Sequence, residues 1–108
     1  MRLPKPPQSE GREQTGDRPC LVLSDDRFNK SSGLFVAVLL TSVEKPQFGQ
    51  FRPKISAGEA NLRKDSWAQT DQIATLSSSR LTSRIGMVGA RTMDEVIDRL
   101  KILLHIFP

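Results

Sequence analysis

The side chains of Glu13, Arg18 and Thr41 have chemistry that suits the handling of a phosphate ester. The planar guanidinium of Arg18 could hold two phosphate oxygens, and its charge persists at any working pH. A carboxylate such as that of Glu13 can act as a base when burial or a neighbour raises its pKa toward neutrality. Glu13 lies five positions before Arg18 (18 − 13) in one polar loop, so the two side chains can converge on one phosphate.

Thr41 ends an apolar run, at a position from which its side chain can project into a cleft. Its hydroxyl could donate to a nonbridging phosphate oxygen but cannot by itself drive proton transfer. RNA carries its own nucleophile, the 2′-hydroxyl, so cleavage without metal requires only a base, an acid and donors for the crowded phosphorus centre. Arg18 suits the role of donor and is a poor acid, because its pKa is above about 12.

The scarcity of other reactive side chains excludes several classes of site. Cys20 is the only cysteine and His105 the only histidine, which excludes an internal disulfide, a cysteine-based zinc site and a catalytic histidine pair. We therefore expect no metal and no cofactor. A single cysteine also fits a reducing, cytoplasmic location.

Length and charge suit one small domain with a polyanionic partner. The chain has 108 residues and a formal net charge of +4, so residues 1–108 are expected to form a single domain. A basic balance is compatible with nucleic acid but is weak support alone. No apolar run approaches the roughly 20 residues that span a bilayer, so no membrane association is expected.

Hydrophobic patterning predicts a mainly β (α+β) fold. Apolar or alternating segments predict strands over 20–24, 33–41, 51–56, 66–76 and 84–88. Pro53 restricts the third of these to an edge or bulge position. Neither side of the 66–76 segment is cleanly apolar, so this strand could run past a functional surface. The polar segments 25–32, 43–49 and 57–65 are predicted loops, and 77–81 is a predicted turn or single helical turn.

A C-terminal helix is predicted over 92–105, after a Pro-rich, irregular N-terminal segment over 1–12. Thr92 and Glu95 have the spacing of a capping box at the start of a helix. An apolar face with helical spacing follows, made by Val96, Ile97, Leu100, Leu103 and Leu104. Short strands followed by one packed helix predict a small half-open barrel.

The order of these pieces resembles the MazF/PemK family of toxin endoribonucleases. The family carries an E-Q-x-G-x-R-P loop, which matches residues 13–19, and a Thr at the end of a following strand, which matches Thr41. The stretch 71–81 is similar to the family's D-Q-I-x-T-[LIV]-x-x-x-R-L sequence. The resemblance spans roughly residues 13–104 and implies the SH3-like half-open barrel of MazF and CcdB proteins.

The resemblance also implies a function and a set of site residues. It implies the toxin of a type II toxin–antitoxin system, a metal-independent, sequence-selective endoribonuclease that cleaves single-stranded RNA such as mRNA by 2′-hydroxyl attack. Arg18 and Thr41 match the family's catalytic pair, with Glu13 as a third catalytic residue. Gln14 and Gln72 are assigned to RNA binding. The family further implies a homodimer, a small antitoxin that occupies the RNA groove, and operator DNA as a ligand of the toxin–antitoxin complex.

Two further features of the sequence each allow two interpretations. Arg52, Lys54, Arg63 and Lys64 could track a phosphate backbone, or could form a solvated face because acidic residues interleave. We assign Arg52 and Lys54 to RNA binding. Trp67 could be a base-stacking platform, but a core position is favoured.

Two other functions compete with RNA cleavage. A CcdB-like inhibitor of DNA gyrase would share the barrel and act without catalysis, but it would not need a phosphate-handling loop. An inactive remnant is the second alternative, because the residues before Glu13 are Pro-rich where the family has a strand, and only Leu3 could be part of that strand. A missing strand would expose a sheet edge.

Overall fold

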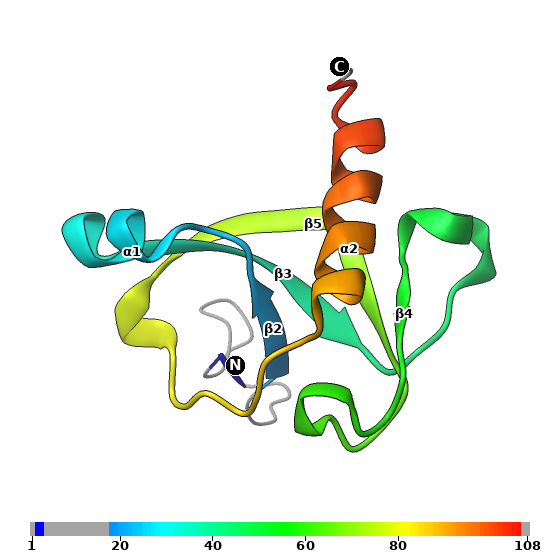
Figure 1. Ribbon diagram of the computed structural model, residues 1–108, viewed down its shortest axis with the longest axis horizontal. Coiled ribbons are helices and arrows are strands. Elements are labelled where there is room, and N and C mark those ends of the chain that lie inside the picture. The colour runs from blue at the N-terminus through cyan, green and yellow to red at the C-terminus, as the bar shows by residue number, and fades with distance from the viewer. Residues whose placement is uncertain (1, 4–17, 107–108) are drawn as a thin grey trace, which may run out of the picture.

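The computed structural model describes residues 2–3 and 18–106, and they form one curled antiparallel sheet with a helix standing across it (Figure 1). The sheet has five strands in the order β1-β2-β3-β5-β4. The strands are β1 Arg2–Leu3, β2 Arg18–Val22, β3 Leu34–Thr41, β4 Lys54–Ile55 and β5 Ser66–Ser77. This architecture confirms the predicted half-open barrel with a C-terminal helix.

Two α-helices and three 3₁₀ turns complete the described part of the chain. The helices are α1 Asp26–Ser32 and α2 Ala90–Leu103, and the turns are η2 Pro46–Phe51, η3 Glu59–Asn61 and η4 Ser78–Arg80. Among the described residues no helix is long and apolar enough to cross a bilayer.

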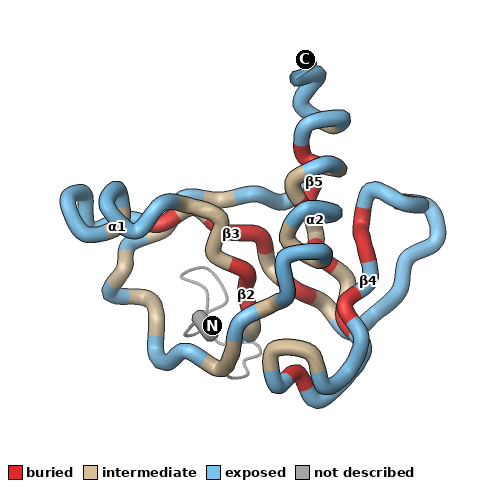
Figure 2. The backbone as a smooth tube through the Cα atoms, in the orientation of Figure 1, coloured by how far each residue is buried: buried red, intermediate tan, exposed pale blue. Residues whose placement is uncertain are grey.

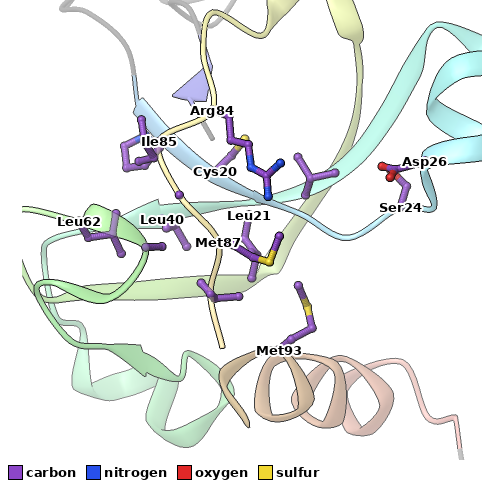
Figure 3. A pocket seen from close by; sticks show the side chains of 15 residues that line it. Cys20, Leu21, Ser24, Asp26, Leu40, Leu62, Arg84, Ile85, Met87 and Met93 are labelled. Atoms are coloured by element: carbon purple, nitrogen blue, oxygen red, sulfur yellow. The ribbon is translucent and has the colours of Figure 1, made fainter. Parts of the chain in front are cut away.

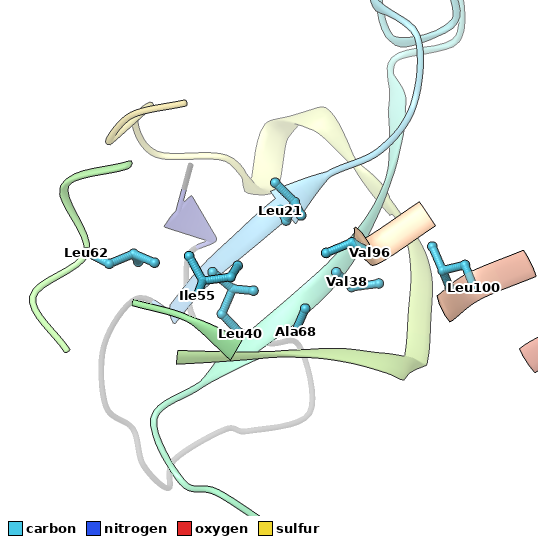
Figure 4. Close-up of a cluster of buried hydrophobic side chains, with 8 residues drawn as sticks. All are labelled: Leu21, Val38, Leu40, Ile55, Leu62, Ala68, Val96 and Leu100. Atoms are coloured by element: carbon cyan, nitrogen blue, oxygen red, sulfur yellow. The ribbon is translucent and has the colours of Figure 1, made fainter. Parts of the chain in front are cut away.

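Side chains on the two faces of the sheet form separate apolar clusters, because successive strand residues point to opposite faces. One face packs against Val96 and Leu100 of α2 (Figure 4). Its strand residues include Leu21, Val38, Leu40, Ile55 and Ala68. The other face carries a smaller cluster of Cys20, Phe35 and Ala37. Figure 2 shows that the buried positions gather in the middle of β3 and its neighbours.

A large bulge bends β5 and gives the sheet its curl. Val38 pairs with Ile73, but Leu40 pairs with Ala68, so Leu39 alone faces the β5 residues 69–72. Extra residues in one strand of a pair bend that strand and increase its twist. Inside the bulge, the Thr70 hydroxyl donates to the Phe51 carbonyl, which ties the bend to η2.

Most predicted strands are confirmed, with shifted ends. The 33–41 and 66–76 predictions correspond to β3 and β5, and the predicted turn at 77–81 contains η4. The 51–56 prediction shrinks to the two-residue edge strand β4, directly after Pro53. Residues 2–3 also form a strand, where an irregular segment was predicted, and Leu3 pairs with Arg18. The edge of β2, which would be exposed without a preceding strand, is therefore paired with β1 at Arg18 and Pro19.

Two predicted elements are wrong. Residues 25–32 were predicted as a loop but form α1, which begins after an Asp25 cap and ends at Gly33 with φ 72°. No residue of α1 is buried, so the segment lacks the apolar stripe that predicts a helix. Residues 84–88 were predicted as a strand but pair with no other strand, although Ile85 and Val88 still pack against the core.

The C-terminal helix is confirmed, but its start is not the predicted capping box. Helix α2 begins at Ala90 with Gly89 as its cap, and no side chain of its own caps it. Thr92 and Glu95 both lie inside the helix. The carboxylate of Glu59, from η3, accepts the Gly89 N–H at 3.1 Å instead.

Candidate functional site

The sheet register brings Arg18 and Thr41 together. Strand β2 pairs with β3 so that Cys20 faces Leu39 and Leu21 faces Val38, and two more residues in this register place Arg18 opposite Thr41. Both residues line one pocket of about 550 Å³. The first residue of β2 and the last residue of β3 meet at the same end of the sheet because the strands are antiparallel. The predicted pair therefore shares a site.

Among the residues that the structure describes, the walls of this basic pocket carry positive charge and no carboxylate. Arg18, Arg63 and Lys64 line it, and the neutral polar side chains of Ser42 and Gln69 lie beside them. The other lining residues are Pro19, Leu40, Thr41, Asn61, Leu62, Ser66 and Ile85. Three cations lining one cavity suit a polyanionic ligand.

Thr41 has a hydroxyl that is oriented but still able to donate. Its Oγ1 accepts a hydrogen bond from the Val43 backbone N–H at 3.1 Å. A hydroxyl that accepts in this way keeps its own hydrogen for another acceptor. The side chain is partly buried at the end of β3, so it can present this hydrogen to a phosphate oxygen in the pocket.

The loop that supplies Arg63 and Lys64 is held in an unusual backbone conformation. Ala60 and Asn61 have positive φ angles of 53° and 62°, a region that residues other than Gly seldom adopt. The Asn61 amide donates to the Ile85 carbonyl at 2.7 Å. A Cβ at Gly86 would lie 2.5 Å from the Ala60 carbonyl oxygen, so the two segments pack backbone to backbone. We call these contacts between η3 and the segment before α2 the clasp, and they position Arg63 and Lys64, which follow η3 in the chain.

Arg52 has a structural position, unlike its predicted RNA-binding role. Its side chain is 5% exposed, and its Nε and Nη2 donate to the two carboxylate oxygens of Asp71 at 2.7 and 2.8 Å. The guanidinium also lies over the Phe48 ring, 3.6 Å from its centroid. Hydrogen bonding from Arg52 holds the pKa of Asp71 below its usual value. These contacts occupy Arg52 and argue against direct contact with RNA.

The other predicted residues lie outside the lining of the basic pocket. Lys54 is exposed, with Nζ 3.4 Å from the Asp65 carboxylate. Gln72 is exposed in the bulge of β5. Glu13 and Gln14 lie outside the described residues, so their assignments stay predictions. No group of three His, Cys, Asp or Glu side chains that could hold a metal occurs in the described ranges.

A second, apolar pocket adjoins the basic one. Its volume is about 320 Å³, and it shares Pro19, Leu40, Leu62 and Ile85 with the basic pocket. Met87 and Met93 face each other across it (Figure 3). Cys20 also lines this pocket, and burial raises the pKa of its thiol to about 11. At neutral pH Cys20 is therefore a protonated, unreactive thiol, as expected for a buried apolar residue.

Sequence reasoning did not select the residues that complete the basic pocket. Arg63 and Lys64 were noticed as part of a basic cluster, but nothing in their spacing separated them from Arg52 and Lys54. The signal that separates them is three-dimensional, because Asp71 lies 19 positions from Arg52 in the sequence and pairs with it only in the fold. Asn61 was not singled out, although an Asn next to a Gly-containing turn is a common αL residue.

Comparison with known proteins identifies the family of this chain. The family model described as "PemK-like, MazF-like toxin of type II toxin-antitoxin system" matches residues 2–104. Endoribonuclease MazF9 of Mycobacterium tuberculosis is 30% identical over 92% of this chain and 87% of its own. Endoribonuclease EndoA of Bacillus subtilis is 33% identical over 89% of this chain and 83% of its own.

Solved structures show the same fold. A chain of a MazE–MazF crystal structure from Deinococcus radiodurans superposes with a TM-score of 0.80 at 30% identity, and the match covers 98% of this chain and 91% of that chain. The strand order, the packed C-terminal helix and the pocket shared by Arg18 and Thr41 thus occur in a chain of which residues 2–104 match one family. This protein belongs to the PemK-like, MazF-like toxins of type II toxin–antitoxin systems.

Proposed function

We propose that this protein is the toxin of a type II toxin–antitoxin pair and that it cleaves single-stranded RNA in the basic pocket. The observation that supports this most directly is that Arg18 and Thr41 line one cavity together with two further cations, Arg63 and Lys64. The curated relatives MazF9 and EndoA are named as endoribonucleases, which agrees with this chemistry.

In the proposed reaction, the 2′-hydroxyl of one nucleotide attacks the adjacent phosphorus. The new O2′–P bond replaces the P–O5′ bond, so the products carry a 2′,3′-cyclic phosphate and a 5′-hydroxyl. Arg18 binds two phosphate oxygens and neutralises the charge that develops on them. Thr41 donates to a nonbridging oxygen, and Glu13 is assigned as the base that accepts the 2′ proton. A solvent water protonates the leaving O5′.

Arg63 and Lys64 are proposed to hold the RNA backbone beside the cleaved bond. Both side chains are exposed and line the wall of the basic pocket. Unlike Arg52, neither meets a carboxylate among the described residues that line that pocket. Backbone contacts of this kind set affinity and position without reading sequence.

The proposed partners follow from the family. We assign a small antitoxin as protein partner, since one solved relative is a MazE–MazF structure. A homodimer, operator DNA bound together with the antitoxin, and a cytoplasmic location are further parts of this proposal. An acidic antitoxin segment would compete with RNA for the same cations.

The decisive experiment is cleavage of a long single-stranded RNA by the purified protein in excess chelator. Discrete cuts are expected from the parent, and Arg18→Ala should slow cleavage by roughly a hundredfold or more, because a transition-state donor is lost. Arg91→Ala is the matched control, since Arg91 is exposed on α2 and does not line the pocket. Equal cleavage by the parent and Arg18→Ala would contradict the assigned role. No cleavage by a folded parent would favour a non-enzymatic inhibitor.

A further inference from the structure

The single tryptophan of the chain lies outside both apolar clusters. Trp67 is partly buried, yet it belongs neither to the cluster under α2 nor to the cluster on the opposite face. A large aromatic side chain usually contributes strongly to a core. Trp67 is therefore not a member of either core cluster, although the sequence favoured a core position.

Trp67 lies in a row with the proposed catalytic pair. On β5 it is directly opposite Thr41 of β3 and, on its other side, opposite Lys54 of β4. The register of β2 with β3 places Arg18 opposite Thr41. The row across four strands therefore reads Arg18, Thr41, Trp67, Lys54. Adjacent strands lie about 4.8 Å apart, so the Trp67 backbone is one strand from that of Thr41.

The row faces away from helix α2. Leu40 and Ala68 are paired, and both pack in the cluster with Val96. Their neighbours Thr41 and Trp67 must point to the opposite face because side chains alternate along a strand. By the same alternation Lys54 points with Trp67, since Ile55 is in the cluster under α2.

We propose that Trp67 is a stacking platform for a nucleobase next to the phosphate held by Arg18 and Thr41. The proposal rests on the proposed function and adds a base-binding subsite to it. Every base has a π-face, so one indole can accept different bases. Lys54 Nζ lies 6.0 Å from the Trp67 ring centroid, close enough to contact the next phosphate of a strand that crosses the ring.

The contacts of Lys54 leave its ammonium available to a phosphate. The ammonium is 3.4 Å from the Asp65 carboxylate, and both side chains are about half exposed. An exposed ion pair of this kind is weak, so Lys54 can exchange its carboxylate for a phosphate. A base on the indole and phosphates at Arg18 and Lys54 would then follow one direction across the sheet.

The test uses the fluorescence of Trp67, which is the only tryptophan in the chain. The probe is a 2′-O-methyl RNA oligonucleotide, which lacks the attacking hydroxyl and cannot be cut. A second oligonucleotide with the same backbone and abasic sites is the comparison. Binding of both is measured separately through the anisotropy of a terminal dye.

The expected result is quenching that saturates together with anisotropy for the first oligonucleotide, and binding with little quenching for the abasic one. Trp67→Leu should weaken binding of the first oligonucleotide by roughly tenfold, whereas Trp67→Phe should retain most of the affinity. Phe28→Leu is the matched aromatic control, since Phe28 is exposed on α1. Circular dichroism of each variant verifies the fold.

Other outcomes would overturn the proposal. Binding without quenching, or equal quenching by the abasic oligonucleotide, would show that Trp67 does not stack on a base. A fluorescence change that follows protein concentration without RNA would place Trp67 against a second copy of the chain. RNA cleavage in either case leaves the proposed function intact, whereas absence of both cleavage and binding would contradict the function itself.

Discussion

Arg52 and Asp71 form an ion pair whose strength comes from geometry and shielding. The two hydrogen bonds are parallel, at 2.7 and 2.8 Å, and the two side chains are 5% and 25% exposed. Exposed pairs contribute little to stability, but removing one member of a shielded pair leaves an unpaired buried charge. The pair also links η2 to the bulge of β5, so it supports the bend of the sheet.

We expect Asp71→Ala to lower the free energy of unfolding by about 2–3 kcal/mol, because Arg52 would keep its charge without a partner. Urea denaturation of the two proteins measures the difference. Asp98→Ala is the control, since Asp98 pairs with Arg99 at the surface and its loss should cost less than about 1 kcal/mol. Equal effects of the two substitutions would mean that the Arg52–Asp71 pair is no better shielded than a surface pair.

The same pair should make stability depend on pH. Hydrogen bonding from Arg52 lowers the pKa of Asp71 below the usual 3.8, so the unfolded chain binds its proton more readily than the folded protein. The contribution of Asp71 is therefore fully present above the unfolded pKa and is lost as pH falls through the folded pKa. Urea denaturation between pH 6 and pH 3 should show a steeper acid loss for the parent than for Asp71→Asn. Parallel curves would contradict this assignment.

At the scale of elements, the clasp between η3 and the segment before α2 combines three contacts. The Asn61 amide binds the Ile85 carbonyl, the Glu59 carboxylate accepts the Gly89 N–H, and Gly86 packs against the Ala60 backbone. Each contact joins two stretches that are 24 to 30 positions apart in the sequence. The loop with Arg63 and Lys64 therefore depends on a remote segment for its shape.

Gly86→Ala should break this clasp. Its Cβ would lie 2.5 Å from the Ala60 carbonyl oxygen, and backbone shifts of this kind cost typically about 1–3 kcal/mol. Thermal denaturation and RNA cleavage should both show a loss. Gly89→Ala is the matched control, because its Cβ would meet only the Glu59 carboxylate at 3.8 Å. A Gly86→Ala protein with parental stability and activity would show that the segments separate without cost.

The elements that could be predicted from sequence are those whose signal is local. Strands β3 and β5 have continuous apolar or alternating patterns, and α2 has an apolar face with helical spacing, so all three were found. Helix α1 was missed because it buries nothing. The predicted start of α2 was wrong because the Gly89 N–H binds the carboxylate of Glu59, which lies in a distant loop. Thr92 and Glu95 have the spacing of a capping box, so they predicted a start inside the helix.

At the scale of the molecule, the basic pocket gathers its cations from separate strands and loops. Arg18 begins β2, whereas Arg63 and Lys64 come from the segment between η3 and β5. That Arg18 and Thr41 share one pocket could be expected because the family motif names both residues. The further cations of the pocket could not be predicted, because Arg52 pairs with Asp71 only in the fold.

Replacing Arg63 and Lys64 by Ala should lower the affinity for RNA and make that affinity less dependent on salt concentration. For single strands, each lost phosphate contact reduces the magnitude of the slope of log K against log salt by roughly 0.7. The slope of the Arg63→Ala, Lys64→Ala double variant should therefore be smaller in magnitude by up to about 1.4. Fluorescence anisotropy over a series of salt concentrations measures the slope. Arg91→Ala should leave the slope unchanged, and an unchanged slope in the double variant would remove both residues from the RNA path.

The clasp at η3 has a consequence for shortened versions of the chain. The assigned functional side chains all precede residue 84, among them Arg18, Thr41, Arg63 and Lys64. A protein that ends there would keep these side chains but lose the segment that holds them in position. It would lose Ile85, which lines both pockets and accepts the Asn61 hydrogen bond. A premature stop codon after β5 should therefore abolish the activity of the toxin, although all of its reactive side chains would still be present.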